Sequence, residues 1–154
     1  MKLYLLQQIF TFGDKFVVYD EKESERYYVE GELFSFGKKL HVCNAYDEEV
    51  ALIHQRPFSF PPTFTVKKGE RELATIVKEF TLFHQAYTVE GPDWQVDGNF
   101  FDHEYTISKG DQVIATVSKE WFTFGDSYEI DVKNDHDEVV ALCTALVIDI
   151  ILED

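Results

Sequence analysis

One carboxylate, Asp149, lies inside the aliphatic run VVALCTALVIDIILED, which extends from Val139 to Asp154. If the run is helical, the positions three and four residues from Asp149 are mainly apolar, so its side chain projects from an apolar surface. A buried carboxylate is costly unless it is hydrogen-bonded. We therefore expect Asp149 to accept hydrogen bonds from the surrounding structure, or to lie near a solvated end. A ligand-binding or metal-binding role is the alternative.

The acidic stretch DVKNDHDE, from Asp131 to Glu138, has the composition of a cation-binding loop. An EF-hand calcium loop needs oxygen ligands at alternate positions and a Glu at the twelfth. Counted from Asp131, the third position is Lys133 and the twelfth is Leu142, so the register fails. The sequence therefore predicts a solvated turn that caps a helix, with Asp135 or Asp137 as the cap.

The histidines offer little support for a metal site. They lie at positions 41, 54, 84, 103 and 136, without an HExxH motif or an i, i+4 pair. Zinc ligands are usually grouped more closely in sequence, so a site formed by His54, His84 and His103 is a remote alternative. The segment GDSY at Gly125 lacks the Gly-x-Ser-x-Gly elbow of a serine nucleophile, and the chain has no Gly-rich phosphate motif. We assign no catalytic, cofactor-binding or metal-binding residue and expect no cofactor.

Net charge narrows the range of partners. The chain has 14 Lys and Arg against 29 Asp and Glu, which gives a formal net charge of −15. Nucleic acids and anionic membranes attract basic surfaces, and the basic cluster at Lys67, Lys68 and Arg71 is interleaved with Glu70 and Glu72. We therefore expect no nucleic-acid partner. An unidentified ligand or protein partner remains, and the charge disfavours peripheral membrane contact.

Neither end of the chain has the features of a membrane segment. The start, MKLYLLQQIF, has an apolar stretch too short for a signal peptide. The run from Val139 to Leu152 is shorter than the roughly 17–25 residues of a spanning helix, and acidic residues flank it. Cys43 and Cys143 have no CxxC spacing and are expected to be reduced and buried. We predict a cytoplasmic protein without a transmembrane segment.

Internal repeats predict the elements that must position these residues. The stretch TVKKGERELATIVKEFTLFHQAYTV from Thr65 aligns without a gap to TISKGDQVIATVSKEWFTFGDSYEI from Thr106. Each copy has alternating apolar residues, a polar turn with Gly69 or Gly110, and further alternation, which is typical of a β-hairpin. Such units recur along residues 1–154, so we expect one all-β domain, a barrel or sandwich, with pseudo-repeat halves near 27–86 and 87–154.

Several aromatic residues are expected to contribute to the core. In RPFSFPPTF, from Arg56 to Phe64, the alternation predicts that Phe58, Phe60 and Phe64 face inward from an edge strand. Pro61 and Pro62 would then form a corner. An aromatic loop that enters a membrane interface is the alternative. Trp94 and Trp121 are also interpreted as core residues.

The C-terminal run breaks the repeat. Its alanines and leucines favour a helix, although its β-branched residues oppose one. A helix that is apolar on every side must be buried on every side. We therefore predict that the run passes through the interior of a closed β-barrel.

The segments DWQVDGNF, from Asp93 to Phe100, and KEWFTFGDSY, from Lys119 to Tyr128, resemble the bacterial branch of the LURP-one-related family, and the similarity covers essentially the whole chain. The resemblance implies a tubby-like fold, which is a closed antiparallel barrel threaded by a hydrophobic C-terminal helix. Phospholipid scramblases are predicted relatives, and tubby domains bind phosphoinositides through basic side chains that have no match here.

Three functional hypotheses follow. The first is a non-enzymatic binding or scaffold module with an unidentified ligand. The second is a peripheral protein that contacts phospholipids or phosphoinositides, assisted by a cation. The third is an enzyme of unrecognised type, which would require clustered titratable groups in a cleft.

Overall fold

The computed structural model describes residues 1–6, 15–32, 37–80, 85–122 and 125–153. In these ranges twelve β-strands precede one α-helix. The strands are β1 (Lys2–Leu6), β2 (Lys15–Asp20), β3 (Glu25–Gly31), β4 (Lys39–Asn44), β5 (Glu49–Gln55), β6 (Thr63–Lys68), β7 (Arg71–Phe80), β8 (Gln85–Glu90), β9 (Trp94–Asn99), β10 (Glu104–Lys109), β11 (Gln112–Phe122) and β12 (Gly125–Val132). A 3₁₀ turn, Asp135–Asp137, leads into the helix α1 (Glu138–Glu153).

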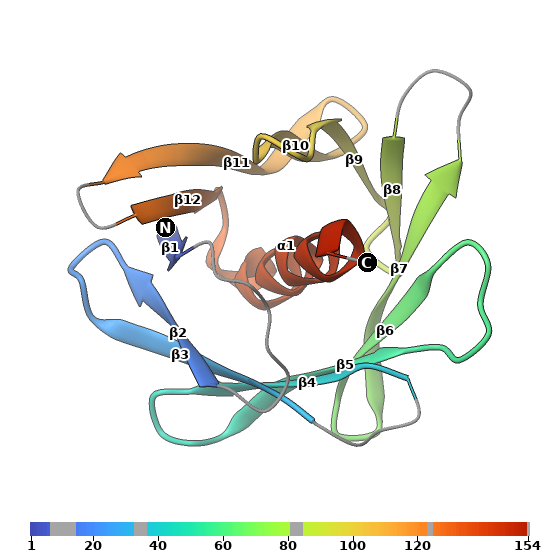
Figure 1. Cartoon of the computed structure of the whole chain (residues 1–154), viewed down its shortest axis with the longest axis horizontal. Helices are drawn as coiled ribbons and strands as arrows, with labels where there is room; N and C mark the ends of the chain where they lie inside the picture. The colour runs from blue at the N-terminus through green and yellow to red at the C-terminus, as the bar shows by residue number, and fades with distance from the viewer. Residues whose placement is uncertain (7–14, 33–36, 81–84, 123–124, 154) are drawn as a thin grey trace.

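The strands form a closed antiparallel barrel in which each strand pairs with its sequence neighbours (Figure 1). Closure comes from β1, which pairs with β2 on one side and with β12 on the other. A closed barrel has no unpaired strand edges, so every described strand satisfies its backbone on both sides. The predicted all-β barrel with a C-terminal helix is confirmed.

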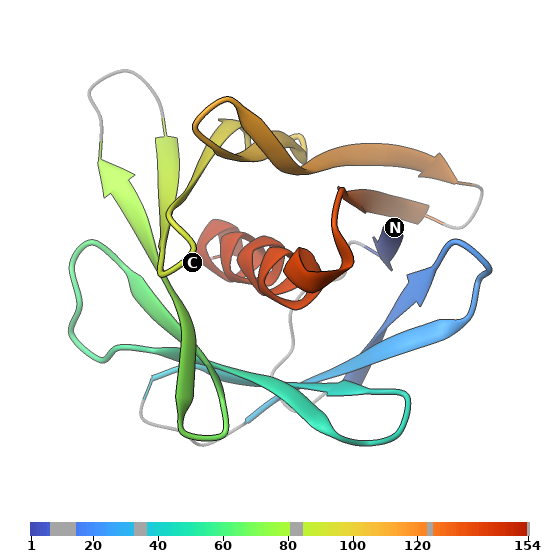
Figure 2. The ribbon, with the colours of Figure 1, turned by 180° about the vertical axis from the view of Figure 1, so that it is seen from behind.

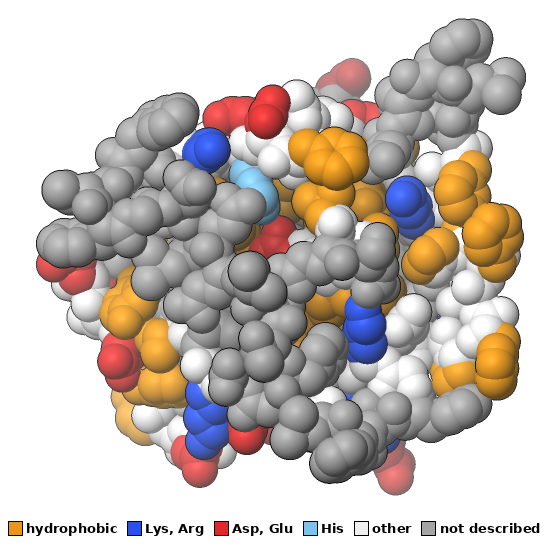
Figure 3. Space-filling view, in the orientation of Figure 1, with side chains coloured by type: hydrophobic (Ala, Val, Ile, Leu, Met, Phe, Trp, Pro, Cys, Tyr) orange, Lys and Arg blue, Asp and Glu red, His pale blue; other side chains and the backbone are white. Residues whose placement is uncertain are grey.

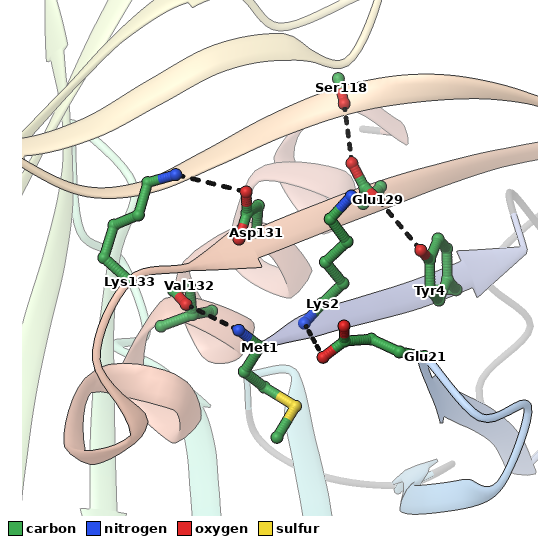
Figure 4. Close-up of polar contacts among 9 residues, drawn as sticks. All are labelled: Met1, Lys2, Tyr4, Glu21, Ser118, Glu129, Asp131, Val132 and Lys133. Carbon is green, nitrogen blue, oxygen red and sulfur yellow. Dashed lines mark hydrogen bonds and ion pairs between the residues drawn. The ribbon is translucent and has the colours of Figure 1, made fainter.

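Polar contacts on the outer surface reinforce the closing strand (Figure 4). Glu129 on β12 accepts a hydrogen bond from the Tyr4 hydroxyl at 3.0 Å and pairs with Lys2 Nζ at 3.2 Å. The amino group of Met1 donates to the Val132 carbonyl at 3.2 Å. Ser118 Oγ on β11 reaches the other Glu129 oxygen at 3.5 Å. One carboxylate therefore joins three neighbouring strands.

The aligned repeats are equivalent hairpins. Thr65 and Thr106 start them in β6 and β10, and the turn glycines Gly69 and Gly110 have φ values of 60° and 57°. In β6–β7 the pairing register shifts after Val66, and in β10–β11 it shifts after the aligned residue Ile107. A bulge at the same repeat position bends both hairpins in the same way, which helps the sheet to close.

Helix α1 passes through the barrel interior (Figures 1 and 2). It packs against β5, β6, β7, β11 and β12, and all its side chains from Ala141 to Ile148 are buried. Three of these strands carry small, fully or almost fully buried residues, Ala51, Ala74 and Ala115. Burial of each large aliphatic side chain of the helix contributes about 1.5–3 kcal/mol before entropy is deducted. The C-terminal run is therefore the centre of the hydrophobic core.

The helix starts at an anchored carboxylate. Glu138 is buried, and one of its oxygens accepts hydrogen bonds from Arg26 Nε at 3.1 Å and from the Tyr27 hydroxyl. The suggested caps, Asp135 and Asp137, lie in the preceding 3₁₀ turn. A negative charge in the first turn also suits the helix dipole.

Two predictions about the core need correction. Phe58 and Phe60 do not face inward: they are 93% and 87% exposed, and they lie in the β5–β6 loop instead of an edge strand. Closure of the barrel leaves no edge strand at this position, and only Phe64, within β6, is buried. Cys143 is buried as expected, but Cys43 is half-buried, and both thiols are free. Trp94 is buried as expected, whereas the Trp121 side chain lies outside the described residues.

Candidate functional site

Asp149 lies in the last turns of α1 and joins the helix to the barrel wall. Its Oδ1 atom is 3.1 Å from His103 Nε2, and its Oδ2 atom accepts a hydrogen bond from the Tyr128 hydroxyl. The Asp149 side chain is 17% exposed, against 5% for His103. The carboxylate thus has both features expected from the sequence: partners in the barrel wall and a position near a solvated end.

A tight turn between β9 and β10 positions His103. The His103 amide donates to the Phe100 carbonyl at 3.2 Å, and His103 has a φ of 52°. Asn99 and Asp102 are also hydrogen-bonded across this turn. The imidazole stacks on the Tyr128 ring with a centroid distance of 4.5 Å and an interplanar angle of 18°. The ring that contacts Asp149 is therefore held by both backbone and stacking.

Three aromatic side chains, Tyr87, Phe100 and Tyr105, extend the cluster. Phe100 lies between the other two, with centroid distances of 4.8 Å to Tyr87 and 5.1 Å to Tyr105. Both tyrosines are buried, and their hydroxyls have no hydrogen-bond partner among the described residues. Burial and the nearby negative charge of Asp149 raise the pKa of Tyr87 to about 12 and that of Tyr105 well above its usual value. Both phenols are neutral at physiological pH and can act as hydrogen-bond donors.

Gly98 allows β9 to approach β10 closely beside this cluster. It pairs with Tyr105 and has a φ of 146°. A Cβ atom at this position would lie 2.5 Å from the Tyr105 Cα atom and 2.5 Å from the Glu104 carbonyl oxygen. The segment from Asp93 to Phe100, which carries much of the family resemblance, thus builds one wall of the cluster.

Three exposed aromatic side chains and one half-buried lysine form a group that we call the aromatic rim. It consists of Phe58, Phe60, Phe80 and Lys78. The rings of Phe60 and Phe80 stack with a centroid distance of 5.1 Å, and Lys78 Nζ lies 5.7 Å from the Phe80 ring centroid. Lys78 is directly opposite Tyr87 in the β7–β8 register, which places the rim beside the cluster. Sequence reasoning assigned two of these phenylalanines to the core because alternation alone cannot distinguish a strand from an extended loop.

The space-filling view shows the end of the barrel at which α1 ends (Figure 3). A histidine side chain and acidic side chains are visible on this face, and hydrophobic side chains gather along its right-hand edge. Figure 2 shows the opposite end, where the chain enters α1.

The other candidate residues are not brought together at this site. Of the three histidines in the suggested zinc set, His54 lies on β5, His103 lies in the β9–β10 turn, and His84 lies outside the described residues. His136 is exposed and lies 3.5 Å from Asp137. Among the described residues, no group of three or more His, Cys, Asp or Glu side chains is arranged to hold a metal ion.

His41 forms a separate polar group on the outer surface. Its Nε2 atom is 2.7 Å from Glu32, and its Nδ1 atom contacts Glu49. Burial alone would lower the pKa of His41, but the hydrogen bonds and charges of the two carboxylates outweigh burial and raise it. These residues join β4 to β5 and to the end of β3, so they contribute to the barrel wall.

A closed antiparallel barrel with a hydrophobic C-terminal helix through its centre is the tubby-like fold. The chain belongs to the LURP-one-related family, whose model matches residues 1–149. It is 29% identical over 152 residues to the uncharacterized protein YxjI of Bacillus subtilis strain 168, covering 99% of this chain and 94% of that protein.

A solved plant structure has the same fold. It is the X-ray structure of an Arabidopsis thaliana protein, with a TM-score of 0.66 and 12% sequence identity. The match covers 97% of this chain and 90% of the plant chain. Among the described residues, no helix combines the length and apolar character that crossing a membrane requires.

Proposed function

We propose that this protein is a non-enzymatic binding module of the cytoplasm and that the aromatic rim is its contact surface. The observation that carries the proposal is the exposure of Phe58, Phe60 and Phe80, which are 93%, 87% and 59% exposed. Neighbouring exposed aromatic side chains in a folded protein typically mark an interaction site. Their position in and beside a loop makes them accessible to a partner.

The charge distribution supports this choice of surface. From Val50 to Gly69 the chain contains no Asp or Glu, although its net charge is −15. Arg56 precedes the exposed phenylalanines, and Lys78 lies over Phe80. Aromatic residues and arginine are enriched at the energetic centres of interfaces. The loop that carries Phe58 and Phe60 therefore provides hydrophobic contact without carboxylates of its own, whereas Glu79 lies beside Phe80 in β7.

The contacts within the polar cluster are accounted for by a structural role. The carboxylate of Asp149 is already hydrogen-bonded to His103 and Tyr128, and these two rings stack on each other. Side chains that orient one another in this way stabilise the end of α1. A catalytic assignment would instead need a nucleophile or base directed at a substrate.

A matched pair of variants tests the proposal. Phe58→Ser with Phe60→Ser removes two exposed rings, and Tyr46→Ser removes a ring that is 85% exposed at the β4–β5 turn. Cytoplasmic extract is passed over each immobilised protein, and bound proteins are identified by mass spectrometry. We expect a protein that is retained by the wild type and by Tyr46→Ser but lost from the double variant. Equal retention by all three would contradict a role for the rim.

A second candidate function is peripheral contact with phospholipids. The observation that favours it is the pairing of highly exposed phenylalanines at a loop with Arg56 and Lys78, because aromatic rings and cations suit the headgroup region. Co-sedimentation with phosphatidylcholine vesicles, with and without phosphatidylserine, phosphoinositide or calcium, tests this function. Binding that is lost in the double variant but kept in Tyr46→Ser would select it. Absence of sedimentation with every vesicle would eliminate it.

A further inference from the structure

Two buried tyrosine hydroxyls of the aromatic cluster have no hydrogen-bond partner among the described residues. The side chains of Tyr87 and Tyr105 are 1% and 3% exposed, and neither hydroxyl has a hydrogen-bond partner among the described residues. Burial of a polar group without a partner is unfavourable, and such groups in folded proteins usually contact an ordered water or a ligand. A donor pair of this kind therefore indicates an additional molecule.

The three groups converge from different elements. Tyr87 is on β8, Tyr105 on β10 and Asp149 on α1, and both tyrosine rings contact Phe100. Asp149 is hydrogen-bonded to His103 in the same β9–β10 turn that carries Phe100, so the carboxylate belongs to this group of side chains, and neither phenol is hydrogen-bonded to it. A carboxylate has about four acceptor positions, and His103 and Tyr128 occupy two. Asp149 can thus accept another hydrogen bond.

We infer that a hydroxyl group occupies the space between Tyr87, Tyr105 and Asp149, accepting hydrogen bonds from both phenols and donating one to the carboxylate. Its source is either an internal water or the hydroxyl of a small organic molecule. Three polar contacts match the usual number for a buried water. This internal site is separate from the aromatic rim, so it does not depend on the function proposed for that surface.

The three groups differ in exposure. Asp149 retains 17% side-chain exposure, whereas the tyrosines are almost fully enclosed. Asp149 is therefore the member of the group that contacts solvent.

Removal of either tyrosine hydroxyl should change the Tm in a way that depends on whether a water or an organic molecule (the guest) is bound at this site. Tyr87→Phe and Tyr105→Phe each delete one oxygen. If the hydroxyl bonds a guest, each variant loses a hydrogen bond, and its Tm falls by about 2–4 °C. If the hydroxyl has no partner, its removal relieves an unfavourable burial, and the Tm is unchanged or rises. Tyr128→Phe, which loses a bond to Asp149, is the positive control, and Tyr46→Phe, at an exposed position, is the negative control.

Two further measurements on the full wild-type chain distinguish the sources. Nuclear Overhauser contacts between the Tyr87 or Tyr105 hydroxyl proton and water identify an internal water. A mass excess in native mass spectrometry that disappears on denaturation identifies an organic guest, whose hydroxyl is then established from its structure. Either result, together with lower Tm values in both phenylalanine variants, supports the inference. Unchanged or raised Tm values would overturn it, and so would lower values with neither a water contact nor a bound mass.

Discussion

His103 Nε2 lies 3.1 Å from Asp149 Oδ1, although 46 residues separate the two in sequence. This contact joins the β9–β10 turn to the end of the central helix. At the start of the same helix, Glu138 accepts a hydrogen bond from Arg26 Nε at 3.1 Å. Since α1 is apolar along most of its length, these polar contacts near its two ends can fix its position and rotation within the barrel. Hydrophobic burial is non-directional, so by itself it specifies the position and rotation of the helix less strictly.

Asp149→Asn tests the contribution of this carboxylate. Asparagine retains one oxygen acceptor but directs an NH₂ group at the other donor, so we expect the free energy of unfolding to fall by about 1–3 kcal/mol. Loss of the negative charge should also lower the pKa of Tyr87 from about 12. Urea denaturation measures the first effect, and ultraviolet titration of the phenols measures the second.

Asp111→Asn, at an exposed position in the β10–β11 turn, is the control for loss of one negative charge. A Tyr87 pKa that is unchanged in Asp149→Asn would contradict the electrostatic effect. Unchanged stability would show that Asp149 does not anchor the helix.

Gly98→Ala should disrupt the β9–β10 pairing next to the polar cluster. The new Cβ atom would meet backbone at 2.5 Å, and the φ of 146° is unfavourable for a side chain. We expect a loss of more than about 2 kcal/mol in the free energy of unfolding, because the clash adds to the backbone strain. Gly69→Ala is the matched control, since its Cβ atom would meet nothing within 4 Å.

Gly69→Ala should lower the free energy of unfolding by only about 1 kcal/mol, because alanine is strained at the positive φ of 60° but meets no clash. Thermal or urea unfolding compares the two variants. Equal losses would show that close approach to Tyr105 is unimportant.

Periodicity was sufficient for much of the fold. The aligned hairpins at Thr65 and Thr106 have the predicted turns at Gly69 and Gly110, and the apolar run forms the predicted internal helix. Local alternation and turn chemistry carry this information within each repeat. The isolated carboxylate in the run also indicated correctly that Asp149 needs hydrogen-bond partners.

The partners themselves could not be predicted, because they come from distant segments. Neither His103 nor Tyr128 is near Asp149 in sequence, and only closure of the barrel brings them together. The error at Phe58 and Phe60 has a different cause: alternating phenylalanines also occur in an extended loop, where both sides are solvated. A period of two predicts an inward face only when the segment is a strand.

Removal of the helix should prevent folding of the barrel. Deletion of residues 139–154 removes the centre of the core, including the fully buried Leu142 and Leu146. We expect loss of the cooperative thermal transition, because the strands would then enclose no apolar partner. Calorimetry or near-ultraviolet circular dichroism measures this. A truncated protein that melts cooperatively near the wild-type temperature would contradict the role of α1.

Leu146→Ala also tests the contribution of α1 to the core, with a smaller perturbation. The variant should fold, and its free energy of unfolding should fall by about 2–5 kcal/mol, as for other substitutions that leave a large cavity in a core. Val113→Ala, at a position that is 39% exposed, is the control and should change stability much less. A loss in Leu146→Ala no larger than in this control would show that the helix is loosely packed.

The stability of the barrel wall at His41 should depend on pH in a defined direction. The carboxylates of Glu32 and Glu49 raise the pKa of His41 above its ordinary 6.5, even though burial alone would lower it. The folded state therefore holds this proton more tightly than the unfolded state. The stabilisation is fully present below pH 6.5 and is lost as pH rises through the raised pKa.

Glu32 has the opposite dependence. The hydrogen bond with His41 is the main cause of its lowered pKa, so its contribution is present above its ordinary pKa of 4.5 and is lost as pH falls through the lowered pKa. Urea unfolding from acidic to mildly alkaline pH, for the wild type and His41→Gln, isolates the contribution. We expect the stability difference between the two proteins to be largest between pH 4.5 and 6.5. A constant difference across the range would show that His41 acts through packing instead of charge.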